Sequence, residues 1–179
     1  MGSARRARVV LLAVVLVFTG AACKSGRSRV TVQNEEQPAE KQLLSTIKMN
    51  DAAAAPQLLR GFYGVENNAW RWTSGKFSVL LRTPPAAQNG ATFTLGFSVP
   101  EGSISKLGKL KLTASVKGTQ LASAEYSKPG AYMLTADVPA SLLSGDTVTI
   151  DFELDKTMRV EGDNRDLGLV AASISLTAK

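Results

Sequence analysis

The sequence predicts an all-β fold, an antiparallel β-sandwich of jelly-roll type with seven to nine strands over residues 59–179. Apolar and polar residues alternate along several short segments, which is typical of strands that bury one face. Turn residues separate these segments at regular intervals, and no long helical period lies between them. These observations favour a sandwich over an α/β fold.

The alternation identifies the expected strands. Phe93, Leu95 and Phe97, for example, are apolar, whereas Thr94 and Ser98 between and after them are polar. Because successive side chains of a strand point to opposite faces, the apolar set shares one face. The expected strands, in chain order, cover residues 77–82, 93–98, 110–116, 121–126, 132–138, 148–154 and 169–176.

Glycine and proline mark the breaks between these strands. Glycine adopts positive φ without strain, and proline fixes its own φ, so each provides a physical reason for a turn. The expected turns cover residues 83–85, 89–90, 100–102, 117–118, 128–130, 144–146 and 161–164. Residues 139–143 are expected to form a single helical turn across an edge of the sandwich.

Composition excludes several classes of function. The chain has 21 basic and 15 acidic side chains, a net charge of +6, but three arginines lie in a segment expected to be removed. The remaining net charge of +3 comes from scattered residues, so we expect no nucleic-acid partner. The chain has no histidine and one cysteine, so it lacks the commonest general base and cannot form an intramolecular disulfide.

The sequence also contains no recognisable catalytic set. It has no G-x-S-x-G, no phosphate-binding loop and no zinc-ligand spacing. Two S-x-x-K matches, at residues 45–48 and 103–106, lack the companion motifs of penicillin-binding proteins. We therefore expect no enzyme activity, no metal site and no cofactor.

The first 22 residues have the pattern of an export signal. Three arginines precede an apolar run over residues 9–18, and small residues occupy positions 20–22. The run of about ten residues is half of the roughly 20 that a membrane-spanning helix needs. Residues 1–22 are therefore predicted to be a signal peptide.

The single cysteine, Cys23, directly follows this signal and resembles the processing site of bacterial lipoproteins. The resemblance implies that Cys23 carries lipid and anchors the protein to a membrane of the bacterial cell envelope. In some bacteria an aspartate after the lipidated cysteine retains a lipoprotein at the inner membrane. This chain has Lys24 at that position, so the resemblance favours the outer membrane. Gly20 stands where the family usually has leucine and also suits the ordinary signal peptidase, which would leave a periplasmic or secreted protein.

Residues 23–58 are predicted to be a lipidated and largely disordered tether. The segment is polar and charged up to residue 40, so it cannot bury enough apolar surface to become ordered. A short helix is possible over residues 40–49. A flexible chain of this length would hold the domain roughly 30–35 Å from its anchor.

Two segments resemble small β-sandwich modules of bacterial envelope proteins, some of which are appended to glycosyltransferases. The first reads GFYGVE at residues 61–66 with WRWT at 70–73, and the second reads GDNRDLGL at 162–169. The resemblance implies a jelly-roll-like sandwich for residues 60–179 and an association with envelope polysaccharide.

Trp70 and Trp72 are the first candidate binding residues. They lie two residues apart, so in a strand they share one face while Arg71 takes the other. One interpretation is a flat aromatic platform on which a sugar ring stacks. The other is that both side chains belong to the hydrophobic core, as large aromatic residues usually do.

The second candidate is a charged set that combines the two segments, Glu66, Arg71, Asp163, Arg165 and Asp166. One interpretation is a polar pocket for sugar hydroxyls. The other is an arginine–carboxylate clasp that locks the two ends of the domain together.

The sequence as a whole therefore predicts a membrane-anchored, non-catalytic lipoprotein that binds envelope glycan. The alternative is a structural or assembly lipoprotein whose partner is another envelope protein.

Overall fold

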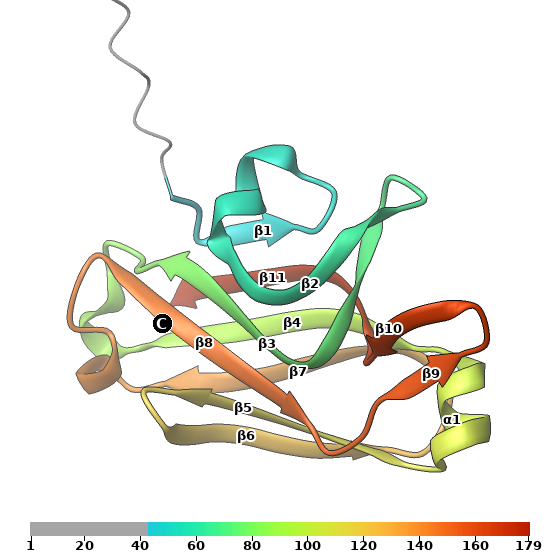
Figure 1. Ribbon diagram of the computed structural model, residues 1–179. Helices are drawn as coiled ribbons and strands as arrows, with labels where there is room; N and C mark the ends of the chain where they lie inside the picture. The colour runs from blue at the N-terminus through green and yellow to red at the C-terminus, as the bar shows by residue number, and fades with distance from the viewer. Residues whose placement is uncertain (1–42) are drawn as a thin grey trace, which may run out of the picture. The chain divides into compact units, whose positions relative to one another are not determined.

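The computed structural model describes residues 43–179 (Figure 1). The predicted signal peptide, Cys23 and the first part of the predicted tether lie outside the described residues. Within residues 43–179, eleven strands, one short α-helix and three 3-10 helices follow one another along the chain. No helix of this part of the chain is both long enough and apolar enough to cross a membrane.

The strands account for most of the described chain. In order they are β1 (Thr46–Lys48), β2 (Leu58–Glu66), β3 (Trp70–Arg82), β4 (Ala91–Val99), β5 (Leu110–Val116), β6 (Thr119–Tyr126), β7 (Gly130–Val138), β8 (Thr147–Leu154), β9 (Met158–Val160), β10 (Asp163–Leu167) and β11 (Val170–Ala178). The helices are η1 (Ala52–Gln57), η2 (Ala87–Asn89), α1 (Glu101–Leu107) and η3 (Ala140–Leu142).

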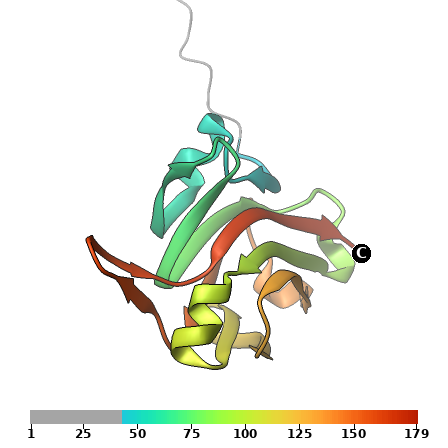
Figure 2. The same ribbon diagram turned by 90° about the vertical axis from the view of Figure 1, so that its right-hand side faces the viewer.

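The strands pair almost entirely into one antiparallel sheet. Among the described residues it has nine strands, with the order β6-β5-β8-β3-β11-β4-β7, while β2 pairs with β3 and β1 with β11. Strands β9 and β10 form a separate pair. The large sheet curls so that β8 and β4 face each other across the core (Figures 1 and 2). The predicted all-β antiparallel class is confirmed, and the main sheet has the largest strand number expected.

The core lies between the two layers of this curled sheet. Phe77 and Phe152 stack with ring centroids 4.8 Å apart, and Phe93 of the opposite layer meets Phe152 edge-on at 5.9 Å. All three side chains are fully buried, and each removes roughly 150–250 Å² of surface from water. Along β4 buried and half-buried residues alternate without a break, as the period-two pattern predicts.

One predicted turn is replaced by a helix. Residues 101–107 form helix α1 after Pro100, where the sequence predicts only a turn over 100–102. The turn predicted over residues 161–164 is present at 161–162, where it joins β9 to β10, and β10 begins at Asp163. The predicted helical turn over 139–143 is present as η3.

The domain begins earlier than the predicted boundary at residue 59. Residues 46–48 form strand β1 instead of the helix considered for 40–49, and η1 follows at 52–57. Ile47 and Met49 are completely buried in the core, so this segment is ordered by burial of apolar surface. The predicted disordered tether is therefore wrong for residues 46–58, and its residues 23–42 lie outside the described part of the chain.

Gln57 explains how this N-terminal segment is held. Its buried amide donates to the carbonyls of Leu44 (2.9 Å) and Leu80 (2.7 Å) and accepts from the Leu44 N–H (2.8 Å). The Arg82 N–H then donates to the Leu44 carbonyl at 3.0 Å. These bonds connect the N-terminal segment around Leu44 to the C-terminal end of β3.

Candidate functional site

The hairpin of β2 and β3 brings the first candidate segment against β10, which belongs to the second. Its turn is tight, because Asn67 and Asn68 have φ values of 50° and 52°. Asparagine tolerates this left-handed conformation better than most residues. Strand β10 lies against β3, so the two segments meet at the start of β3 (Figure 1).

The strand register places several candidate side chains on one face of the hairpin. Glu66 lies directly opposite Trp70, and directly opposed residues of antiparallel strands point to the same face. Trp72, two residues along β3, shares that face. Arg71 lies opposite Val65 on the other face.

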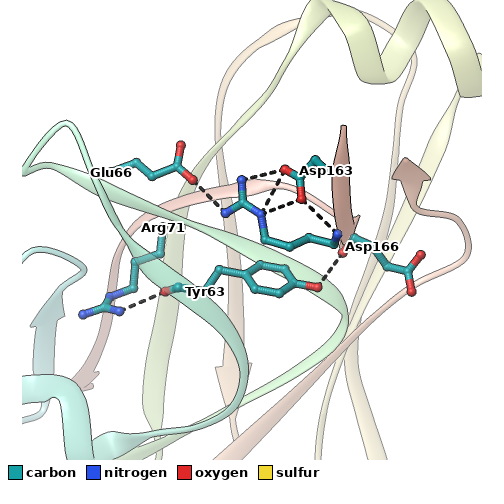
Figure 3. Close-up of polar contacts among 6 residues, drawn as sticks. Tyr63, Glu66, Arg71, Asp163 and Asp166 are labelled. Carbon is teal, nitrogen blue, oxygen red and sulfur yellow. Dashed lines mark hydrogen bonds and ion pairs between the residues drawn. The ribbon is translucent and has the colours of Figure 1, made fainter. Parts of the chain in front are cut away.

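Arg165 sits between two carboxylates. Its Nη1 donates to Glu66 Oε1 at 2.8 Å, and its Nη2 donates to Asp163 Oδ2 at 2.8 Å. Its Nε lies 3.0 Å from both oxygens of Asp163 (Figure 3). We call Glu66, Asp163 and Arg165 the Arg165 clasp. Its side chains are 34%, 25% and 34% exposed, respectively, so the ion pairs are only partly shielded from water.

The clasp holds Asp163 and Arg165 in their charged forms. The side-chain hydrogen bonds from Arg165, together with the one from its backbone N–H, lower the pKa of Asp163 below its usual value. Hydrogen bonds to Asp163 and Glu66 raise the pKa of Arg165 still further above its usual range. At neutral pH Asp163 is therefore ionised and Arg165 protonated.

Tyr63 packs against the Arg165 clasp. The Arg165 guanidinium carbon lies 5.3 Å from the centre of the Tyr63 ring, within the range of a cation–π contact. The Tyr63 hydroxyl donates to the backbone carbonyl of Asp166 at 3.1 Å (Figure 3). Tyr63 thus joins β2 to β10 independently of the ion pairs.

Two members of the predicted charged set serve elsewhere. The Asp166 carboxylate pairs with Arg159, whose Nε lies 2.6 Å from Oδ1, and this contact lowers the pKa of Asp166. Arg71 points away from the clasp and donates to the carbonyls of Met49 (2.8 Å) and Tyr63 (2.9 Å) (Figure 3). The prediction that all five charged residues form one pocket is therefore wrong, because only Glu66, Asp163 and Arg165 come together among the described residues.

Trp70 and Trp72 lie outside the hydrophobic core. Both are half-buried, and neither belongs to the cluster of buried residues between the layers, so the core interpretation is wrong. Their ring centroids are 6.1 Å apart and their planes meet at 84°. The rings therefore form a corner and not a flat platform. We call this pair the aromatic corner.

Two glycines of the candidate segments have an architectural role. At Gly61, which has φ 74°, a Cβ atom would lie 2.1 Å from the Lys76 carbonyl oxygen of the neighbouring strand. At Gly168, a Cβ would lie 2.7 Å from the Ser74 carbonyl oxygen. Both positions need glycine so that β2 and the chain after β10 can approach β3 closely.

Two surface pockets lie away from the corner. A trough of about 310 Å³ crosses β5, β8 and β3, and its charges are neutralised in the pairs Arg60–Asp151 (2.9 Å) and Lys76–Glu153 (2.8 Å). A pocket of about 370 Å³ is lined by loop residues near η2 and η3. Within residues 43–179, no group of three or more histidine, cysteine or acidic residues is placed to hold a metal ion.

No protein-family model matches the chain, and no curated protein sequence matches it. Several solved structures superpose on it. One is the CBM36-1 domain of a multidomain xylanase from the hindgut metagenome of Trinervitermes trinervoides, with 15% identity, 75% of this chain and 96% of that chain covered, and a TM-score of 0.42.

A second is CsCBM6-3 from Clostridium stercorarium in complex with cellobiose, with 8% identity, 76% and 95% coverage, and a TM-score of 0.41. A third is the 4-O-methyl-α-glucuronidase BtGH115A, with 10% identity and a TM-score of 0.46, in which the matched part is 18% of that chain. Superpositions with such TM-scores carry no argument about a ligand, so any function has to be argued from the corner and the clasp.

Proposed function

We propose that residues 43–179 form a non-catalytic carbohydrate-binding module whose site is the aromatic corner beside the Arg165 clasp. The observation that carries this proposal is the placement of Trp70 and Trp72. Both are half-buried outside the core, on the face of the hairpin that also carries Glu66. Apolar rings beside a few fixed polar groups are typical of small-ligand sites.

The corner geometry suits a single sugar ring. Because the tryptophan planes meet at 84°, a ring that stacks on one tryptophan meets the other edge-on. The apolar C–H face of the sugar would then cover one indole, and its hydroxyl groups would point toward the clasp. A longer glycan would bind through one residue, with its other rings continuing past the hairpin.

The clasp retains hydrogen-bonding capacity for such hydroxyls. Among the described residues, only Oε1 of Glu66 is engaged by Arg165, so Oε2 is able to accept a hydroxyl hydrogen. Arg165 has five N–H groups, and its bonds to Glu66 and Asp163 leave one on each terminal nitrogen. One acceptor and two donors therefore lie beside Trp70.

The same geometry disfavours catalysis. Glycoside hydrolysis generally needs one carboxyl group that can donate a proton, with a raised pKa. Here Arg165 holds both Glu66 and Asp163, and it lowers the pKa of Asp163. An arginine fixed between the two acids supports a binding role for this site.

We also propose that the module is exported and anchored to the bacterial cell envelope through lipid on Cys23, where envelope polysaccharide is its ligand. The signal-like pattern of residues 1–22 supports this. Mass analysis of the mature N-terminus tests the anchor: a diacylated Cys23 is expected, and an unmodified first residue would contradict it.

A partner protein of the envelope is the second candidate. Among residues 43–179, strand β7 is hydrogen-bonded only to β4 and lies near β6 without strand pairing, and Met133 on it is 71% exposed. A free sheet edge can accept a strand from another chain. A photocrosslinker at position 133 would capture such a partner in cells, and the absence of any crosslinked product would count against this alternative.

Calorimetry tests the glycan proposal. The purified domain is titrated with soluble oligosaccharides of envelope and plant-type glycans, beside Trp72→Ala and the matched surface variant Met133→Ala. We expect heat with at least one glycan, at least tenfold weaker binding for Trp72→Ala, and unchanged binding for Met133→Ala. Equal binding by wild type and Trp72→Ala would place the site elsewhere, and no binding by wild type would refute the proposal.

A further inference from the structure

We infer that the aromatic corner selects neutral glycans over acidic ones, an inference that rests on the proposed function. The reason is that the arginine of the site is already occupied. Arginine is the residue that usually recognises the carboxylate of an acidic sugar, through two parallel N–H groups of its guanidinium. In this protein those groups are used within the chain.

The guanidinium of Arg165 already makes a two-pronged contact with a carboxylate of its own chain. Its Nε and Nη2 edge is held by the Asp163 carboxylate, at distances of 2.8–3.0 Å. Its Nη1 is held by Glu66 at 2.8 Å. A uronate, sulfate or phosphate could therefore use this Nε and Nη2 edge only by displacing Asp163.

The net charge beside the corner is also unfavourable for an anion. Glu66 and Asp163 contribute two negative charges against the single positive charge of Arg165. The next ion pair, between Arg159 and Asp166, is neutral. Arg71 carries a positive charge on the other face of the hairpin, against the carbonyls of Met49 and Tyr63.

The carboxylates are close enough to act on a bound sugar. Glu66 lies directly opposite Trp70, which places their Cβ atoms about 4.5–5.5 Å apart. An acidic group on a ring stacked against Trp70 would lie within about 10 Å of Glu66, which is the Debye length at 0.1 M salt. The repulsion is therefore felt at low salt and screened at high salt.

The test uses pairs of related glycans in which one member is neutral and the other carries uronate groups. Cello-oligosaccharides and xylo-oligosaccharides are compared with counterparts that carry uronate groups, by calorimetry at about 0.02 M and about 1 M salt. We expect the neutral member to bind at least about fivefold more tightly at low salt, and the ratio to fall toward one at high salt.

Two variants assign the selectivity to the clasp. Glu66→Gln removes one carboxylate and should reduce the low-salt ratio at least twofold. Glu153→Gln, an exposed carboxylate paired with Lys76 on the outer face of β8, should leave the ratio unchanged. Circular dichroism confirms that each variant is folded, and the salt series on the wild-type chain tests the inference without any variant.

The outcomes separate the inference from the proposed function. Tighter neutral binding that converges at high salt supports it. Equal or tighter binding of the acidic member would overturn the inference and leave the module as a glycan binder of another specificity. No binding by any glycan would overturn both.

Discussion

Arg165 Nη1 lies 2.8 Å from Glu66 Oε1, although 99 residues separate the two in the sequence. This contact joins β10 to the last residue of β2, where the chain turns toward the two tryptophans. The same ion pair therefore stabilises the hairpin and places a carboxylate beside the aromatic corner. Its two roles can be separated by experiment.

Replacing Arg165 by lysine should loosen the hairpin without unfolding the domain. Lysine carries one compact charge and cannot bridge Asp163 and Glu66 as the planar guanidinium does. We expect the melting temperature to fall by a few degrees in thermal denaturation. Lys76→Arg, a change of similar size in an exposed pair with Glu153, should leave it nearly unchanged, and a larger effect there would argue against a special role for the clasp.

The pKa of Asp163 predicts a specific acid dependence. Because Arg165 lowers this pKa in the folded state, the unfolded chain binds more protons at this residue in mild acid. The stabilisation is fully present above the unfolded pKa, roughly pH 4, and is lost as the pH falls through the lower folded value. Asp163→Asn should therefore be less stable than wild type at pH 7, and the two should converge as the pH approaches 2. Parallel stability curves for the two proteins would contradict the role assigned to Arg165.

Gly61 is expected to be intolerant of any side chain. Gly61→Ala places a Cβ atom 2.1 Å from the Lys76 carbonyl oxygen at a φ of 74°, so the strands must separate. We expect a loss of more than about 2 kcal/mol in the free energy of unfolding, measured with urea. Gly64→Ala on the same strand meets nothing within 4 Å and should change stability little. A tolerated Gly61→Ala would mean that β2 does not approach β3 as described.

Gln57 should be essential for the N-terminal segment. Gln57→Leu removes the partner of the Leu44 N–H and of the Leu80 carbonyl, whereas the Leu44 carbonyl keeps its bond from the Arg82 N–H. The expected loss is about 2–4 kcal/mol, because two backbone polar groups are left unsatisfied together. Gln120, exposed on β6, provides the control, since Gln120→Leu should lose less than about 0.5 kcal/mol. Hydrogen exchange at residues 44–49 should accelerate in Gln57→Leu alone.

The sandwich could be predicted because its strands bury one face. Along β4 and β8 the alternation is strict, and burial follows it residue by residue. Strand β1 could not be predicted in the same way, since it has three residues and depends on Gln57, 13 positions away from Leu44. Local patterns carry no information about such a contact. The predicted domain boundary at residue 59 therefore lies too late in the chain, after β1 and η1.

The candidate site could be predicted in part. The clasp interpretation named an arginine held by carboxylates, and Arg165 with Glu66 and Asp163 has that arrangement. The sequence could not show that the side chains of Arg71 and Asp166 bond outside the clasp. Arg71 lies on the opposite face of β3 from Trp70, and the Asp166 carboxylate pairs with Arg159. In the sequence, Tyr63 is one residue of the GFYGVE segment and carries no signal of its own contacts. Its contact with the Asp166 carbonyl needs the three-dimensional approach of β2 and β10.

The central claim is that a sugar ring binds at Trp70 and Trp72, and the chain's own fluorescence tests it most directly. These are the only two tryptophans in the sequence, so all tryptophan emission reports on the aromatic corner. Acrylamide quenching is measured for the free domain and for the domain saturated with the glycan that gives heat in calorimetry. The account predicts clear quenching of the free domain and a marked decrease in the quenching constant when the glycan is bound. Quenching that is unaffected by a bound glycan would contradict it.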